Sequence, residues 1–128
     1  MRHKKNNLLQ FESGVQKQSL LMRNMLTSLI TYGYITTTPK RAKVVKSEAN
    51  KLFNRLIRTV REWGEKEWTR RCIAYVKTVL FTETAGKKLI SELLPKFLET
   101  NSTSFMADYK LWLRKWDASE EVRLQILS

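Results

Sequence analysis

Apolar side chains recur at helical spacing over most of the first hundred residues. From about Gln16 to Tyr32 they step by three and four positions, and Gly33 is well placed to end a helix. The same spacing predicts helices over residues 39–63, 65–80 and 83–94, with Pro95 ending or kinking the last one. The helix over residues 39–63 should bury Ala42, Val45, Ala49, Leu52, Phe53, Leu56 and Val60.

Toward the C-terminus the period changes to two, which is typical of β-strands. Residues 105–114 and 122–126 alternate in this way, with a turn at 117–120, so residues 104–127 are predicted to form a β-hairpin. The β-branched and aromatic stretch 34–37 can add a third strand. We therefore predict an α/β fold of the α+β kind, with about four helices on a small, mixed three-stranded sheet.

The 128 residues fit a single domain. Within it we expect an extended basic arm (1–13), a mainly helical part (14–100) and the C-terminal hairpin (104–127). Alternation puts Trp112 and Trp116 on the hairpin face of Arg114, opposite Leu111 and Leu113. Two interpretations stay open for these tryptophans: they contact RNA or a neighbouring protein, or a helix covers them and makes the sheet two-sided.

The net charge of +12 is concentrated in one half of the chain. Residues 1–61 hold 13 Lys/Arg against Glu12 and Glu48, whereas residues 62–128 hold 11 Lys/Arg against 10 acids. Such one-sidedness predicts a polyanionic partner, nucleic acid first and an anionic membrane surface second.

The start of the second helix sharpens that prediction. Thr38 can cap the helix and Pro39 suits its first position, yet the first turns carry only cations: Lys40, Arg41, Lys43 and Lys46. Positive side chains there oppose the helix dipole, so they weaken the helix unless an external anion binds them. Lys43 and Lys46 continue into a polar face with Asn50, Asn54, Arg58 and Arg61.

Several other classes of function lack support in the residues. Cys72 is the one cysteine, so neither an internal disulfide nor a cysteine-based zinc cluster is possible. It falls in an apolar helical pattern, so the thiol should lie in the core. His3 is the one histidine, and Gly86-Lys87-Lys88 lacks the remainder of a phosphate-binding loop. We expect no enzyme, no cofactor, no metal and no small-molecule substrate.

No stretch approaches the ~20 apolar residues of a membrane span, and no signal peptide is predicted, so we expect a cytoplasmic protein. A regulator that reads DNA by a helix-turn-helix would need a tight turn between the first two helices, where a strand is predicted instead. A membrane-surface protein would need a bulkier apolar face on the second helix. A domain catalysing a reaction on RNA remains an alternative.

Specific motifs add a resemblance. Met1 to Lys5 (MRHKK), Arg23 to Met25, Ser28-Leu29, Thr37-Thr38 and Arg41 to Lys43 resemble the family of bacterial large-subunit ribosomal protein seventeen, most clearly over the first 60 residues. Leu94-Pro95-Lys96-Phe97 resembles a later family element. The resemblance implies an α/β domain with an arm that binds large-subunit ribosomal RNA, near the exit of the peptide tunnel and beside other large-subunit proteins.

The resemblance and the charge pattern together give the predicted RNA-binding residues. They are Arg2, His3, Lys4, Lys5, Lys17, Arg23, Asn24, Lys40, Arg41, Lys43 and Lys46. Two stretches depart from the family pattern: residues 9–16 are largely uncharged, and 101–104 replace a glycine-rich basic loop. The alternative to a ribosomal protein is a basic nucleic-acid-binding module outside the ribosome.

Overall fold

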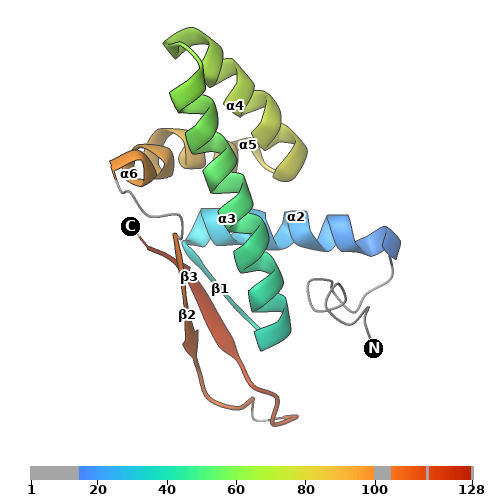
Figure 1. Ribbon diagram of the computed structural model, residues 1–128. Helices are drawn as coiled ribbons and strands as arrows, with labels where there is room; N and C mark the ends of the chain where they lie inside the picture. Colours follow the sequence, from blue (N-terminus) through green and yellow to red (C-terminus); the bar gives the residue numbers. More distant parts are fainter. Residues whose placement is uncertain (1–14, 100–104, 115, 128) are drawn as a thin grey trace, which may run out of the picture.

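The computed structural model describes residues 15–99, 105–114 and 116–127. The elements follow in the order α2 (Val15–Tyr32), β1 (Tyr34–Thr37), α3 (Pro39–Glu62), α4 (Glu65–Val79), α5 (Glu83–Lys88), η1 (Leu89–Leu93), α6 (Leu94–Glu99), β2 (Met106–Lys110) and β3 (Val122–Ile126) (Figure 1). Since α5, η1 and α6 follow one another without a break, the described residues form four helical segments: α2, α3, α4 and the continuous segment from α5 to α6. The α+β fold class and the three-stranded sheet are confirmed. The predicted arm, 1–13, lies outside the described residues.

A glycine sets the corner between the first helix and the sheet. The N–H of Gly33 donates to the carbonyl of Leu29 at 2.8 Å, and its φ of +84° lies in the left-handed region that glycine adopts without strain. The chain then leaves α2 directly as β1. The predicted helix end at Gly33 is therefore confirmed.

The sheet has the order β1-β3-β2, with both pairings antiparallel. It is thus antiparallel throughout rather than mixed. Strand β3 is central, and its alternate residues Val122, Leu124 and Ile126 are buried beneath the helices. The opposite face is open, and there the guanidinium of Arg123 lies 4.0 Å over the ring of Tyr34.

Strand β2 turns the opposite set of residues toward the core from the one that the sequence predicts. The apolar alternation places the odd-numbered residues Phe105, Ala107 and Tyr109 on the buried face. Register places Met106 and Asp108 on the helix-facing side with Ile126 and Leu124, while Tyr109 is exposed on the open side. The reason lies just before the strand. The Phe105 N–H donates to Oδ1 of Asn50 on α3 at 3.2 Å, and the Phe105 ring enters the core there. Phe105 and Met106 are therefore buried in succession.

Three aromatic rings join the helices to the sheet. Phe97 of α6 lies between Phe53 of α3 and Phe105, with ring centroids 4.7 Å apart in both pairs. All three side chains are almost fully buried. Cys72 is buried on α4, as predicted, and burial raises the pKa of its thiol above the ordinary value.

The helix containing Pro95 does not end there. A π turn, η1, lies directly before the proline, and the N–H of Leu94 donates to the carbonyl of Leu89 five residues back. Proline has no N–H and its ring clashes with the preceding turn of an α-helix, so the wider turn lets the chain pass Pro95 and continue to Glu99.

Gly86 also has a structural role rather than a phosphate-binding one. It is buried on α5, and a Cβ built at this position would lie 2.9 Å from Cγ1 of Val76 on α4. The missing side chain therefore allows the close approach of α5 to α4.

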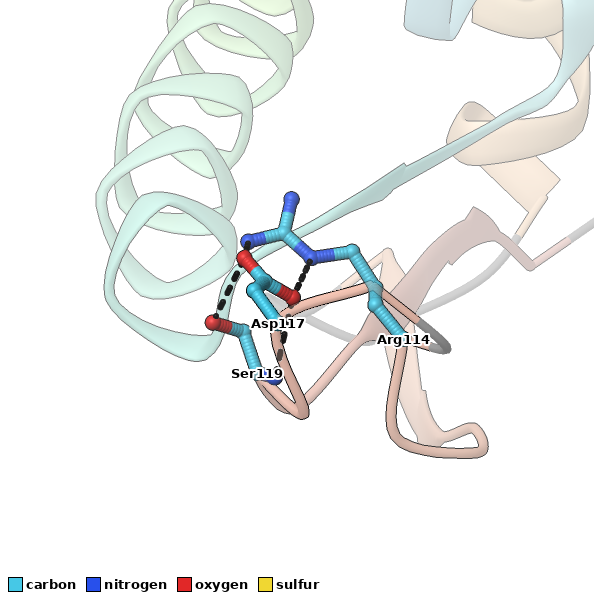
Figure 2. A network of polar contacts seen from close by, with 3 residues as sticks. All are labelled: Arg114, Asp117 and Ser119. Carbon is cyan, nitrogen blue, oxygen red and sulfur yellow. Dashed lines mark hydrogen bonds and ion pairs between the residues drawn. The ribbon is translucent and has the colours of Figure 1, made fainter.

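The two hairpin strands are joined by a longer connection than the predicted turn at 117–120. Regular pairing ends at Lys110 and Val122, and we call residues 111–121 the hairpin loop. Its tip is held by Asp117, whose carboxylate accepts from Nε of Arg114 at 3.1 Å, from Nη2 of Arg114 at 2.7 Å, and from the N–H and Oγ of Ser119, each at 3.1 Å (Figure 2).

No described helix covers the two hairpin tryptophans. Trp112 is 89% exposed and Trp116 is 79% exposed. The interpretation that a helix covers them and makes the sheet two-sided is therefore wrong for the described residues, whose helices pack against one face of the sheet while the hairpin loop extends beyond them (Figure 1).

Candidate nucleic-acid interface

The first turn of α3 exposes backbone donors that no side chain caps. Thr38 occupies the N-cap position in extended conformation, but its side chain accepts no capping hydrogen bond, contrary to the prediction that it would cap. Pro39 follows at the start of the helix, as predicted, and the first turn contains no acid. Backbone N–H groups without a side-chain cap and the positive end of the helix dipole therefore lie together, which is the arrangement that binds anions.

The predicted cations around this helix end differ in their surroundings. We call residues 38–46 the α3 start. Arg41 and Lys43 are exposed, and neither forms an ion pair within the described part of the chain. Lys40 is half-buried. Lys46, one turn further on, places its ammonium 3.1 Å from Oδ1 of Asp108 on β2, so its charge is shared with the protein's own carboxylate.

The structure gives Arg23, a predicted RNA-binding residue on α2, an internal set of contacts. Its Nη2 donates to the carbonyl of Leu80 at 3.3 Å, and its guanidinium lies 4.2 Å over the ring of Phe81. The neighbouring Thr27 hydroxyl accepts from the Phe81 N–H at 3.1 Å. Arg23 therefore fastens the connection between α4 and α5 to α2, which the sequence could not reveal because the residues are 57 positions apart.

The other predicted residues are not gathered with these. Asn24 is exposed on α2. Lys17 belongs to the first turns of α2, and its side chain lies outside the described part. The arm residues Arg2, His3, Lys4 and Lys5 also lie outside the described residues. The α3 start is thus the one place where the described chain brings several predicted residues together.

A second cationic feature was not among the predicted sites. We call it the arginine cleft: a hollow of about 960 Å³ between α3 and α4, whose lining includes Arg55, Arg58, Trp63, Arg71 and Tyr75. The guanidinium of Arg71 lies 3.6 Å from the ring centre of Trp63, and that of Arg55 lies 4.1 Å from the ring centre of Tyr75. Arg58 belongs to the predicted polar face of the helix. The other members meet only because α4 folds back along α3.

Neither a membrane span nor a metal cluster emerges from the described residues. Over 15–99, 105–114 and 116–127 no helix is long and apolar enough to cross a membrane. The same ranges contain no group of three or more His, Cys, Asp or Glu side chains that could hold a metal ion.

Comparison with known proteins adds a consistent family signal. The model of the family described as Ribosomal protein L17 matches residues 21–127. The large ribosomal subunit protein bL17 of Clostridium acetobutylicum is 33% identical over 107 residues, which cover 84% of this chain and 85% of that protein. The bL17 proteins of Clostridium botulinum (strain Hall) and Clostridium perfringens (strain SM101) are each 30% identical over 111 residues, which cover 87% of this chain and 89% of theirs.

Proposed function

The chain belongs to the ribosomal protein L17 family and is a protein of the large ribosomal subunit, and we propose that there it binds and stabilises folded large-subunit ribosomal RNA. The proposed role is structural and requires no catalysis. Its main described contact is the α3 start, and the predicted arm residues Arg2, His3, Lys4 and Lys5 would extend the contact along the RNA.

The observation that carries the proposal is the charge at the α3 start. Arg41 and Lys43 are exposed beside uncapped backbone N–H groups, and no acid lies in the first turn. In the isolated protein each such cation opposes the helix dipole by a few tenths of a kcal/mol. Against RNA phosphate the N–H groups, the dipole and both side chains attract the same anion, so the arrangement becomes favourable on binding.

The position within the subunit follows from the family resemblance. We place the protein near the exit of the peptide tunnel, beside other large-subunit proteins. The uneven charge supports such a bound state. Residues 1–61 carry a net charge of +11, and residues 62–128, with 11 Lys/Arg and 10 acids, do not balance it.

Replacing the exposed cations tests the RNA contact. In the variant Arg41→Ala/Lys43→Ala we expect folding to be intact, or α3 slightly more stable, because an unfavourable interaction with the dipole is removed. Affinity for a large-subunit ribosomal RNA transcript should fall, and the slope of log affinity against log salt should flatten by about one unit per lost phosphate contact.

The matched control is Lys77→Ala/Lys87→Ala, which removes two exposed cations from α4 and α5 and should leave the slope unchanged. Sedimentation with the large subunit through a high-salt sucrose gradient gives the second measurement. The proposal would be contradicted by a double variant at the α3 start that unfolds the domain while its salt slope stays that of the wild type.

A further inference from the structure

The arginine cleft carries an excess of positive charge that the internal contacts do not remove. Its lining contains four cationic side chains, Lys51, Arg55, Arg58 and Arg71, and one acid, Glu62. Lys51 has a carboxylate partner in Glu48 at 3.3 Å, whereas Nε of Arg71 lies farther, 3.9 Å, from Oε2 of Glu67. Arg58 is exposed and has no ion-pair partner among the described residues. A concave surface with this balance attracts an anion.

Two of its arginines are already positioned by aromatic rings. Arg71 lies over Trp63 and Arg55 lies over Tyr75, at 3.6 and 4.1 Å. A guanidinium held over a ring can keep its outward N–H groups available, and it loses less conformational entropy when it binds a phosphate. The cleft therefore presents donors whose directions are fixed before the ligand arrives.

The rings also favour a particular kind of anion. Trp63 is still 43% exposed even though a guanidinium lies over it. An exposed indole beside arginines can stack an unpaired base while the arginines bind the adjoining phosphates. Bases within a duplex are stacked on each other and cannot reach an aromatic wall, and an acidic peptide would use the arginines without using the indole.

We propose that the arginine cleft binds a single-stranded segment of RNA. The proposal deepens the proposed function by naming a second contact and its ligand. The phosphates lie against Arg58 and Arg71, and a base lies on Trp63. The cleft shares no residue with the α3 start, because its lining begins at Ser47 on α3 and continues onto α4.

The test uses the full chain and an unstructured eight-nucleotide RNA whose binding is followed by fluorescence anisotropy at several salt concentrations. We expect Arg58→Ala/Arg71→Ala to weaken binding by about tenfold or more and to flatten the salt slope by about 1.4, or ~0.7 for each lost phosphate contact on a single strand. The matched control Lys66→Ala/Lys77→Ala removes two exposed cations of α4 outside the cleft, and should bind as the wild type does.

The indole is tested separately. Trp63→Ala should weaken binding by about fivefold to a hundredfold, the range for one stacked base, and Trp63→Phe should restore much of the loss. Thermal unfolding verifies that each variant is folded; if Trp63→Ala is not, the exposed Arg58 and Arg71 substitutions still decide the question. The idea is overturned if the arginine variant binds the oligonucleotide as the wild type does. It is also overturned if folded Trp63→Ala binds normally and poly-glutamate of equal length displaces the RNA.

This experiment fails or succeeds independently of the proposed function. The unstructured oligonucleotide tests the cleft, whereas the folded transcript and the α3 start variant test the binding of folded ribosomal RNA. Normal oligonucleotide binding by the arginine variant, together with loss of transcript binding by Arg41→Ala/Lys43→Ala, removes only the cleft. If instead the arginine variant loses oligonucleotide binding and Arg41→Ala/Lys43→Ala binds the transcript normally, only the proposed role of the α3 start is contradicted.

Discussion

Two regions of this protein place an arginine over a tryptophan, and they differ in what else holds the arginine. In the arginine cleft Arg71 lies 3.6 Å from the ring centre of Trp63, and its Nε lies 3.9 Å from Oε2 of Glu67. In the hairpin loop Arg114 lies 4.6 Å from the ring centre of Trp116, but its guanidinium is forked onto the carboxylate of Asp117 (Figure 2). Both arginines lie over a tryptophan ring, but the carboxylate beside Arg114 is bound by two short hydrogen bonds, whereas the one beside Arg71 is more distant.

The surroundings of the two pairs follow the same division. The cleft has four cations and one acid in its lining. Residues 105–127, which contain the hairpin, have four Lys/Arg and four Asp/Glu and so no net charge. An arginine–tryptophan pair is therefore not by itself a mark of RNA binding. What matters is whether a carboxylate of the protein already occupies the N–H groups that a phosphate would use.

The hairpin also limits the basic face of α3. Asp108 of β2 lies 3.1 Å from the ammonium of Lys46, so the predicted cationic face meets an acid from the sheet at that position. Exposed pairs of this kind contribute little to stability, typically up to ~1 kcal/mol. Their effect here is instead to reduce the charge that Lys46 can offer to RNA, which leaves Arg41 and Lys43 as the stronger candidates.

The largest expected effect comes from the core that joins the two regions. Phe97→Ala should lower the free energy of unfolding by about 3–5 kcal/mol, because Phe97 touches both Phe53 of α3 and Phe105 at the start of β2. Urea unfolding measures the loss, and Lys96→Ala, at an exposed neighbouring position, is the control. Tryptophan fluorescence and far-UV circular dichroism should report one transition. Two separate transitions would show that the cleft and the hairpin are not parts of one cooperative unit.

The next effect tests the comparison directly, by freeing the hairpin arginine. Asp117→Asn removes the carboxylate charge that holds Arg114. If counter-charge is what separates the two regions, the variant should bind single-stranded RNA more tightly, with a salt slope steeper by up to ~0.7 for one new phosphate contact. Glu120→Gln is the matched control, since it removes an equal charge from an exposed residue of the same loop without touching Arg114. Equal gains in both variants would assign the effect to net charge alone.

The sequence predicted the helices and the sheet far better than it predicted this loop. Long periodic segments and Gly33 have local causes, so α2, β1 and α3 begin or end within about one residue of the prediction. The parity of β2 could not be read in the same way, because it depends on a hydrogen bond from Phe105 to Asn50, 55 residues away.

The candidate site shows the same division between local and tertiary causes. The cations of the α3 start were predictable from their place at a helix N-terminus. The internal contacts of Arg23 and the assembly of the arginine cleft were not, because both depend on how α4 packs against other helices. The alternating pattern likewise could not decide whether a helix covers Trp112 and Trp116, because alternation assigns side chains to a face of the sheet but does not show what packs on that face.

A smaller effect concerns the pH range in which the loop tip stays fixed. Desolvation alone would raise the pKa of Asp117, but hydrogen bonds from Ser119 and the charge of Arg114 outweigh it and hold the pKa below the ordinary value of 3.8. Because the pKa of Asp117 is lower in the folded protein, its carboxylate stabilises the folded tip at any pH above the ordinary pKa. This stabilisation is lost as the pH falls through the lower, folded-state pKa. The tip should therefore loosen only in strong acid, below pH 3.8.

Titration of the Asp117 carboxyl by NMR measures this directly. Arg114→Ala and Ser119→Ala should each raise the pKa of Asp117, because each removes a group that favours the charged form. An unaltered Asp117 pKa in both variants would mean that the network in Figure 2 does not hold the tip.

The smallest effect is expected at the two exposed tryptophans of the hairpin loop. Trp112→Ala and Trp116→Ala should each change the free energy of unfolding by no more than about 0.5 kcal/mol, because the side chains are 89% and 79% exposed and leave no cavity when truncated. Chemical denaturation measures both, with Phe97→Ala as the scale. A loss of several kcal/mol at Trp112 would require that another part of the chain covers the loop in solution, and the contrast between a cationic cleft and a neutral, exposed hairpin would then no longer hold.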